Sequence, residues 1–134
     1  MSDFVLDPRL EADTAFIADW ELSRLLLMDD ARFPWLILVP RRADLTEMDE
    51  LGADEQAKLL RETGRAMTLL RSVAPCDKMN IGALGNIVRQ LHVHVVARRT
   101  GDAAWPGPVW GSGAPARYES AARESMVGRL RGVP

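Results

Sequence analysis

Short apolar runs separated by turn-forming residues dominate the first forty positions of the chain. Two of them occupy Ala15–Trp20 and Leu22–Met28, and a third, Trp35–Val39, lies between Pro34 and Pro40. An apolar run bounded by prolines is typical of a buried β-strand, because proline has no N–H to donate to a neighbouring strand. We therefore predict three strands, although the leucines and the methionine of the first two runs suit a helix as well.

The spacing of apolar residues changes at Asp54. From there to Ala74, apolar residues recur every three or four positions, which places them on one face of a helix. Asp54 suits the N-cap of this helix and Pro75 suits its end. We also predict one short helical turn within Leu45–Leu51 and a terminal helix within Arg117–Arg131.

The remaining strands are predicted after the long helix. Lys78–Leu84 has the pattern of a strand and loop interrupted by glycine, and Ile87–Arg98 alternates between apolar and polar residues. The alternation places Gln90, His92 and His94 on one face, which is typical of a half-exposed strand. Several strands with one long helix between them predict an α+β domain with a largely antiparallel sheet.

The composition fits one globular domain that spans residues 1–134. Hydrophobic residues make up 47% of the chain and charged residues 27%, which argues against disorder. The net charge of −2 supplies no basic field that would attract nucleic acid. No apolar run approaches the roughly 20 residues of a membrane span, and the N-terminus lacks a signal-peptide pattern. We expect a cytoplasmic protein that binds neither membrane nor nucleic acid.

Two histidines, at positions 92 and 94, are the only ones in the chain. With the single cysteine, Cys76, they are too few for a zinc cluster of cysteines and histidines. Side by side on a strand, one imidazole can attack phosphorus while the other donates a hydrogen bond to a phosphate oxygen. The bare spacing leaves two alternatives open, namely surface histidines without a role and a metal site completed by a carboxylate.

The segment Gln90–Val96, with the sequence QLHVHVV, resembles the motif of the histidine triad (HIT) family. In that motif three histidines alternate with apolar residues and two apolar residues follow. Here glutamine takes the first triad position, and Val95 and Val96 fix the register. Three more segments are similar to segments of the family in the same order, namely Leu36–Arg42, Asn80–Gly82 and Trp105–Gly107. The resemblance covers residues 15 to 110.

The resemblance implies a five-stranded antiparallel sheet that continues across a homodimer. It also implies a nucleotide hydrolase or nucleotidyl transferase that acts on the α-phosphate of nucleoside phosphoramidates or dinucleoside polyphosphates. No metal or other cofactor is implied. The nucleophile, which becomes transiently nucleotidylated, falls on His92, and the third triad position, which would hydrogen-bond phosphate or leaving-group oxygens, falls on His94. The resemblance also implies that Asn80 contacts phosphate or orients the site, and that Asp30, or its neighbour Asp29, contacts ribose.

Two positions depart from the family pattern. Gln90 replaces a histidine, and its amide can form hydrogen bonds but cannot take up a proton. Ile87 stands where many relatives have a polar phosphate contact, and Asn86 is the candidate for that contact. The change at Gln90 leaves a second hypothesis open, in which the chain is a nucleotide-binding or sensing dimer with reduced or no catalysis.

Overall fold

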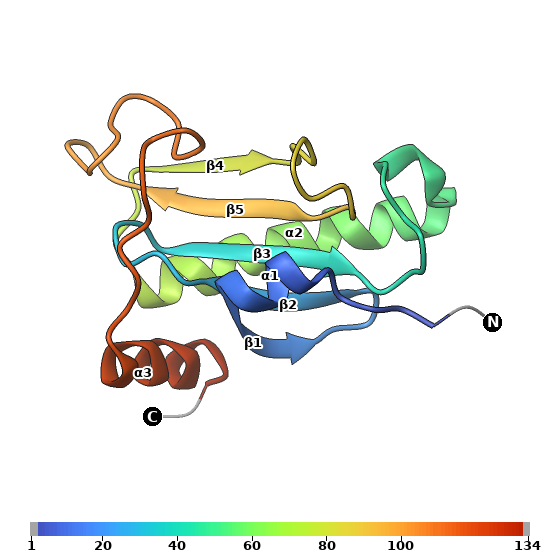
Figure 1. Cartoon of the computed structure of the whole chain (residues 1–134), viewed down its shortest axis with the longest axis horizontal. Helices are drawn as coiled ribbons and strands as arrows, with labels where there is room; N and C mark the ends of the chain where they lie inside the picture. Colours follow the sequence, from blue (N-terminus) through green and yellow to red (C-terminus); the bar gives the residue numbers. More distant parts are fainter. Residues whose placement is uncertain (1–2, 133–134) are drawn as a thin grey trace.

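A five-stranded sheet forms the centre of the computed structural model, which describes residues 3–132 (Figure 1). Every neighbouring pair of strands is antiparallel. In their order across the sheet, the strands are β1 (Thr14–Asp19), β2 (Ser23–Met28), β3 (Trp35–Pro40), β5 (Val93–Arg98) and β4 (Lys78–Gly82). The helical elements are α1 (Pro8–Asp13), the 3-10 turn η1 (Met48–Glu50), α2 (Ala53–Val73) and α3 (Ser120–Leu130). The fold is α+β, as the sequence pattern predicts. Within residues 3–132, no helix is long and apolar enough to cross a membrane.

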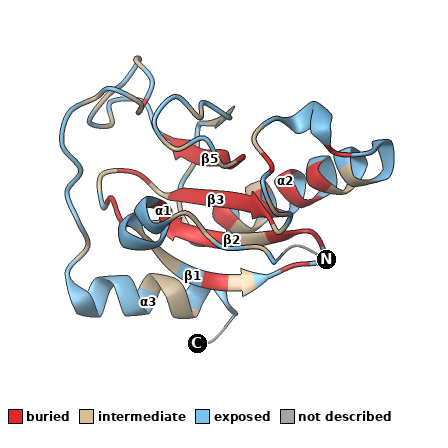
Figure 2. Ribbon diagram, turned by 45° about the vertical axis from the view of Figure 1, so that its right-hand side comes forward, coloured by how far each residue is buried: buried red, intermediate tan, exposed pale blue. Residues whose placement is uncertain are grey.

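Apolar side chains pack on both faces of the sheet. On one face, α2 packs with Leu59 and Leu70 against Leu38 of β3 and Val95 of β5. On the other face, α1 and the loop after β5 lie over a second cluster, to which they contribute Leu10 and Val109, respectively. β3 and β5 are buried along their whole length (Figure 2), because both of their faces are covered.

The predicted elements are present, with shifted boundaries. Both apolar runs near the N-terminus are strands, which settles the alternative with helix. The long helix starts at Ala53, so the prediction of Asp54 as its N-cap is wrong; Asp54 lies in the first turn, where its charge favours the helix dipole. Helix α3 begins at Ser120 and not at Arg117, and β4 ends at Gly82 and not at Leu84.

Helix α1 is an element that the sequence pattern did not predict. Its N-cap is Asp7, whose carboxylate accepts the backbone N–H of Arg9 at 2.8 Å, and Pro8 occupies the first helical position. Aspartate followed by proline is a recognised start signal for a helix. The helix is too short for a clear apolar period, since Leu10 is its one buried residue.

The predicted strand over Ile87–Arg98 is wrong in its first half. Strand β5 begins at Val93, and residues 83–92 form a loop. The prediction of a half-exposed strand is also wrong, because all six residues of β5 are buried. Apolar residues cover the face that carries His94 as well as the opposite face. Gln90 and His92 therefore lie ahead of the strand, and only His94 lies within it.

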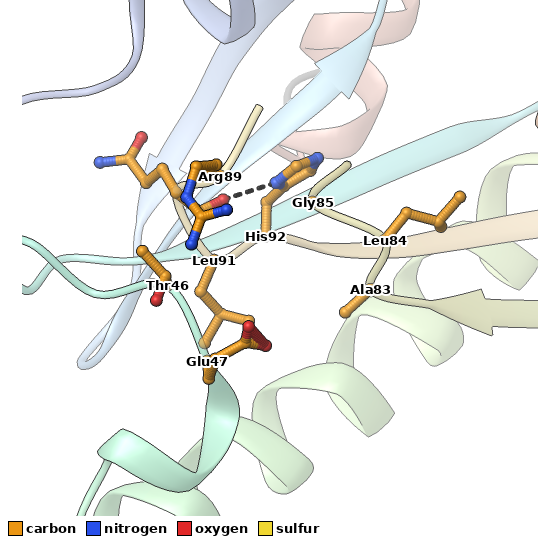
Figure 3. A pocket seen from close by; sticks show the side chains of 9 residues that line it. Thr46, Glu47, Ala83, Leu84, Gly85, Arg89, Leu91 and His92 are labelled. Atoms are coloured by element: carbon orange, nitrogen blue, oxygen red, sulfur yellow. Dashed lines mark hydrogen bonds between the residues drawn. The ribbon is translucent and has the colours of Figure 1, made fainter. Parts of the chain in front are cut away.

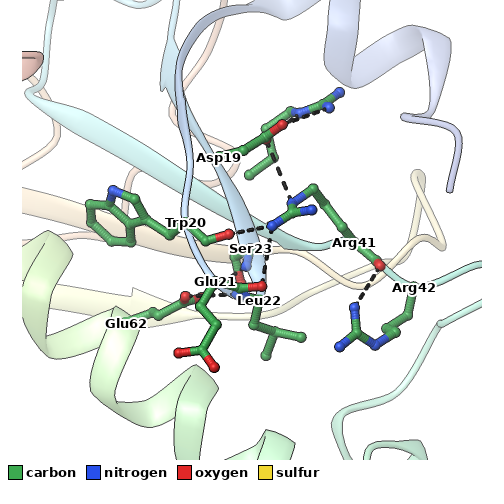
Figure 4. Close-up of polar contacts among 9 residues, drawn as sticks. Asp19, Trp20, Glu21, Leu22, Ser23, Arg41, Arg42 and Glu62 are labelled. Atoms are coloured by element: carbon green, nitrogen blue, oxygen red, sulfur yellow. Dashed lines mark hydrogen bonds and ion pairs between the residues drawn. The ribbon is translucent and has the colours of Figure 1, made fainter.

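A buried carboxylate from α2 holds the turn between β1 and β2 (Figure 4). The two oxygens of Glu62 accept the backbone N–H groups of Leu22 and Ser23 at 3.0 and 2.9 Å. From the end of β3, the guanidinium of Arg41 donates to the carbonyl oxygens of Trp20 and Glu21. Four backbone groups of one tight turn are thus satisfied by side chains that come from other elements.

We expect Glu62→Ala to lower the free energy of unfolding by roughly 2–6 kcal/mol, because an unsatisfied buried N–H costs about 1–3 kcal/mol and two are left. Urea unfolding at pH 7 measures this loss. Glu124→Ala removes an exposed carboxylate from α3 and is the matched control, with an expected change within about 0.5 kcal/mol. Equal stability of the two variants would show that the Glu62 contacts contribute nothing.

Candidate active site

Both histidines line a pocket of about 440 Å³ on the sheet face opposite α2. Trp35 and Ile37 of β3 and Trp110 of the loop after β5 also line it, and further walls come from residues 84–88 and from Asp30 and Arg32. The two imidazole rings meet edge to face with their centroids 4.7 Å apart. The structure therefore brings His92 and His94 together, as the sequence predicts, although they come from a loop and a strand.

A backbone carbonyl fixes the proton of His92. The Nδ1 atom lies 2.7 Å from the carbonyl oxygen of Gln90. A carbonyl oxygen can only accept, so Nδ1 carries the hydrogen, and in the neutral ring Nε2 is left with a free lone pair. The ring is only 7% exposed. The neutral form of His92 thus presents the lone pair of Nε2 in the pocket.

An indole fixes the proton of His94 in the opposite way. The Nε1–H of Trp35 donates to Nδ1 of His94 at 3.0 Å, and both side chains are buried. Because Nδ1 accepts, the neutral ring carries its hydrogen on Nε2. Burial, and to a smaller extent the neighbouring His92, lowers the pKa of His94 from 6.5 to about 3. His94 is therefore a neutral hydrogen-bond donor near pH 7.

The structure places the side-chain amide of Gln90 on the N-terminal segment and not in the pocket. Its Oε1 accepts the backbone N–H of Asp7 and its Nε2 donates to the carbonyl of Val5, both at 2.8 Å. Gln90 is not among the residues that line the 440 Å³ pocket. The predicted row of three side chains is therefore wrong, because the chain is not extended as a strand at this point. Only the backbone carbonyl of Gln90 reaches an imidazole.

The carboxylate of Asp30 lines the pocket and is held by hydrogen bonds from Arg32 and Ala116. Its Oδ1 accepts the backbone N–H groups of Arg32 and Ala116, and both oxygens accept from the Arg32 guanidinium. Burial raises the pKa of Asp30, but these hydrogen bonds outweigh it, and the net direction is downward. Asp29 does not line the pocket; it accepts from the backbone of Tyr118 and from Arg117.

The two asparagines have different surroundings. Asn86 is exposed and lines the pocket from the loop before His92. Asn80 does not line the pocket, because its Oδ1 accepts from the buried guanidinium of Arg98 at 2.9 Å. Arg98 also forms two hydrogen bonds of 2.8 Å with Asp102. Asn80 thus belongs to a network that anchors the loop after β5, which carries Trp110.

Trp35 and Trp110 are two further aromatic residues of the site, of which Trp35 was not expected from the sequence. The ring of Trp110 meets that of His94 edge to face, with centroids 5.4 Å apart. It packs over Gly82, where an added Cβ would lie 3.0 Å from the indole. In the sequence, the glycine of the Asn80–Gly82 motif is the signal that a bulky side chain packs at this position. No comparable signal exists for Trp35, because the pairing register that brings β3 beside His94 cannot be read from the sequence.

A second, smaller pocket of about 40 Å³ lies beside His92 (Figure 3). Thr46, Glu47 and Arg89 are among its lining residues. The volume is enough for one or two water molecules, and the walls offer polar partners. Among residues 3–132, no three His, Cys, Asp or Glu side chains are grouped so as to hold a metal ion.

We expect the stability of the protein to fall as the pH is lowered from about 6.5 towards 3. In this window the unfolded chain binds a proton on His94 that the folded chain does not bind, because the folded pKa is about 3. The slope is at most about 1.4 kcal/mol per pH unit. Urea unfolding at pH 6.5 and 5 measures it, and His94→Asn should show a shallower decline. Identical declines would contradict the depressed pKa.

Known proteins of similar sequence and fold are histidine triad proteins. The family model of the HIT domain matches residues 9–101. A crystal structure of a histidine triad protein from Bradyrhizobium japonicum is 46% identical to this chain and superposes with a TM-score of 0.94 over 98% of both chains. Among curated proteins, none matches the sequence.

Two further crystal structures have the same fold. A histidine triad (HIT) protein from Sinorhizobium meliloti is 48% identical, with a TM-score of 0.93 over 98% of this chain and 97% of its own. A histidine triad protein from Marinobacter aquaeolei is 41% identical, with a TM-score of 0.94 over 98% of this chain and 96% of its own. Since the similarity extends over nearly the whole of each chain and the family model spans the strands and both histidines, the chain belongs to the HIT family.

Proposed function

We propose that the chain is a nucleotide hydrolase or nucleotidyl transferase that works through a nucleotidyl-His92 intermediate. Its substrates are nucleoside phosphoramidates or dinucleoside polyphosphates, attacked at the α-phosphate. The observation that carries the proposal is the complementary pair of Nε2 atoms in one pocket, a lone pair on His92 and an N–H on His94. Membership of the HIT family supports it, and the proposal assigns Gln90 to the first triad position.

The reaction has two displacements at phosphorus. In the first, the Nε2 lone pair of His92 forms a bond to the α-phosphorus, and the bond to the leaving group breaks with its electron pair going to the leaving atom. In the second, water or an acceptor hydroxyl attacks, and the electron pair of the P–N bond returns to Nε2. Throughout, the Nε2–H of His94 donates to a phosphate oxygen and stabilises the charge that develops there.

The pocket has the size and lining that a nucleotide needs. Its volume of about 440 Å³ lies within the range of small-molecule sites. Trp35, Ile37 and Val109 supply an apolar wall. The Oδ2 atom of Asp30 accepts a single hydrogen bond, from Arg32, and keeps capacity for a ribose hydroxyl. Asn86 lines the pocket and is the proposed phosphate contact, while Asn80 acts through Arg98 and the loop after β5.

The alternative function is a nucleotide-binding or sensing protein without catalysis. It was suggested by the replacement of the first triad histidine by Gln90. The position of the Gln90 amide on Val5 and Asp7 argues for the enzyme, because the replacement removes no group from the pocket wall. We therefore expect Gln90→His to leave the rate within about tenfold of the parent rate.

We expect a covalent nucleotide on His92 when the protein is mixed with an adenosine phosphoramidate or with diadenosine tetraphosphate. Peptide mass spectrometry after an alkaline quench, which preserves the P–N bond, locates the adduct. His92→Ala should abolish adduct and turnover, and His94→Asn should lower the rate by about 10²–10³, the cost of one lost oxyanion donor. Turnover that His92→Ala retains would refute the mechanism. Nucleotide binding without turnover in the parent protein would establish the alternative function.

We propose further that two copies join their sheets along β4. The two edges of the sheet differ. At β1 the guanidinium of Arg131 donates to the carbonyls of Phe16 and Ile17, so backbone acceptors of that edge are occupied. No segment among residues 3–132 pairs with the outer edge of β4. This edge and the following loop expose Ile81 by 42% and Ile87 by 79%. Unpaired apolar edges favour pairing with another strand.

We expect Ile81→Lys to convert the dimer into a monomer, because a charge at a paired edge must be desolvated. Light scattering after size-exclusion chromatography gives the mass. Phe16→Lys on β1 is the matched control and should leave the dimer intact, since Phe16 is similarly exposed on the opposite edge. Dissociation of the Phe16 variant alone would place the interface at β1.

A further inference from the structure

We propose that Trp35 is a positioning residue that locks His94 as a neutral Nε2–H donor, so that His94 stabilises charge but never delivers a proton. The consequence deepens the function proposed above and rests on it: the site favours substrates whose leaving group departs as a stable anion. This fixing of the His94 tautomer by Trp35, called the lock below, is a property of the folded chain and can be measured without any substrate.

The hydrogen bond between Trp35 and His94 is compatible with only one tautomer of the neutral His94 ring. An indole N–H can only donate, and the 3.0 Å contact ends on Nδ1 of His94. If the hydrogen of His94 sat on Nδ1, two donors would face each other in a buried place, and both would lose their partner. The contact therefore selects the tautomer with hydrogen on Nε2.

Packing leaves the pair little freedom to rearrange. The Trp35 ring stands edge-on to the ring of Phe33, with centroids 6.4 Å apart. In the sheet, Trp35 of β3 pairs with Val96 of β5. Trp110 lies against His94 with its ring centroid 5.4 Å away. His94 is only 6% exposed between these neighbours. A ring flip that exchanges Nδ1 for another atom would have to displace buried aromatic side chains.

Within residues 3–132, the side chains that line the pocket include no group that could protonate a leaving group. The hydrogen on Nδ1 of His92 is bound to the Gln90 carbonyl, and the Nε2 of that ring forms the bond to phosphorus. Burial keeps His94 neutral, and the amide of Gln90 lies outside the pocket. The other charged side chains in the wall are Asp13, Asp30 and Arg32, and Asp30 is paired with Arg32. No member of this set is an acid with a proton to give near pH 7.

The two proposed substrate classes differ on this point. When a phosphoanhydride is cleaved, the electron pair goes to an oxygen of a phosphate, which is stable as an anion and needs no proton. When a phosphoramidate is cleaved, the electron pair goes to nitrogen, which must take up a proton from the solvent as the bond breaks. We therefore expect kcat/KM for diadenosine tetraphosphate to exceed that for an alkyl phosphoramidate of adenosine by at least tenfold.

Nuclear magnetic resonance of the full chain labelled with ¹⁵N in its two imidazoles tests the lock directly. We expect one ring with hydrogen on Nδ1 and one with hydrogen on Nε2, and His92→Asn assigns the second to His94. The Nε2–H state of His94 should persist from pH 8 down to about pH 4. In Trp35→Phe, His94 should show a mixture of tautomers and titrate at a higher pH. Trp110→Phe, which keeps an aromatic ring against His94, is the control and should not change the tautomer.

A His94 that carries hydrogen on Nδ1 in the parent protein would overturn the lock, and this spectrum decides the point even if Trp35→Phe fails to fold. An unchanged tautomer and titration in folded Trp35→Phe would overturn it as well. The kinetic consequence is tested with adenosine 5′-phosphate esters of phenols of graded acidity. A steep fall of kcat/KM with rising phenol pKa is expected, and a flat dependence would refute the absence of a proton donor. Absence of all turnover would refute the proposed function and leave the spectral result standing.

Discussion

Two hydrogen bonds decide what the histidines of this protein can do. The carbonyl of Gln90 takes the hydrogen of His92 on Nδ1, and the indole of Trp35 supplies a hydrogen to Nδ1 of His94. Two chemically identical side chains, with ring centroids 4.7 Å apart, thereby differ at Nε2, where His92 has a lone pair and His94 an N–H, and this difference underlies their proposed roles as nucleophile and donor. The rest of the fold matters to function chiefly because it places these two partners. β3 carries Trp35 beside β5, and the loop ahead of β5 bends so that a backbone carbonyl meets His92.

Burial on both faces of the sheet gives these hydrogen bonds their effect. In water an imidazole exchanges its proton and changes tautomer freely, but a buried pair cannot do so without leaving polar groups unpaired. The same burial lowers the pKa of His94 to about 3. Covering the site with Trp35, Trp110 and α1 therefore costs stability in acid and holds the His94 ring neutral near pH 7.

Much of the fold could be predicted from the sequence, because strands, long helix and terminal helix follow from apolar periods. That the side chains of His92 and His94 lie side by side was also predictable, because Leu91, Val93 and Val95 alternate with polar residues. The position of Gln90 was not, because a loop can preserve an alternating pattern without being a strand. Trp35 was missed because its partner is 59 residues away in the chain, and only strand register brings the two together.

The position at which a phosphate binds decides whether His92 and His94 can act on it as proposed. The most direct measurement is a crystal structure of the protein with adenosine 5′-monophosphate. We expect Nε2 of His92 to lie about 3–3.5 Å from the phosphorus, as in a near-attack geometry, and Nε2 of His94 to donate to a phosphate oxygen. A phosphate held away from both imidazoles, or an Nε2 of His94 that accepts a hydrogen bond from the ligand, would contradict it.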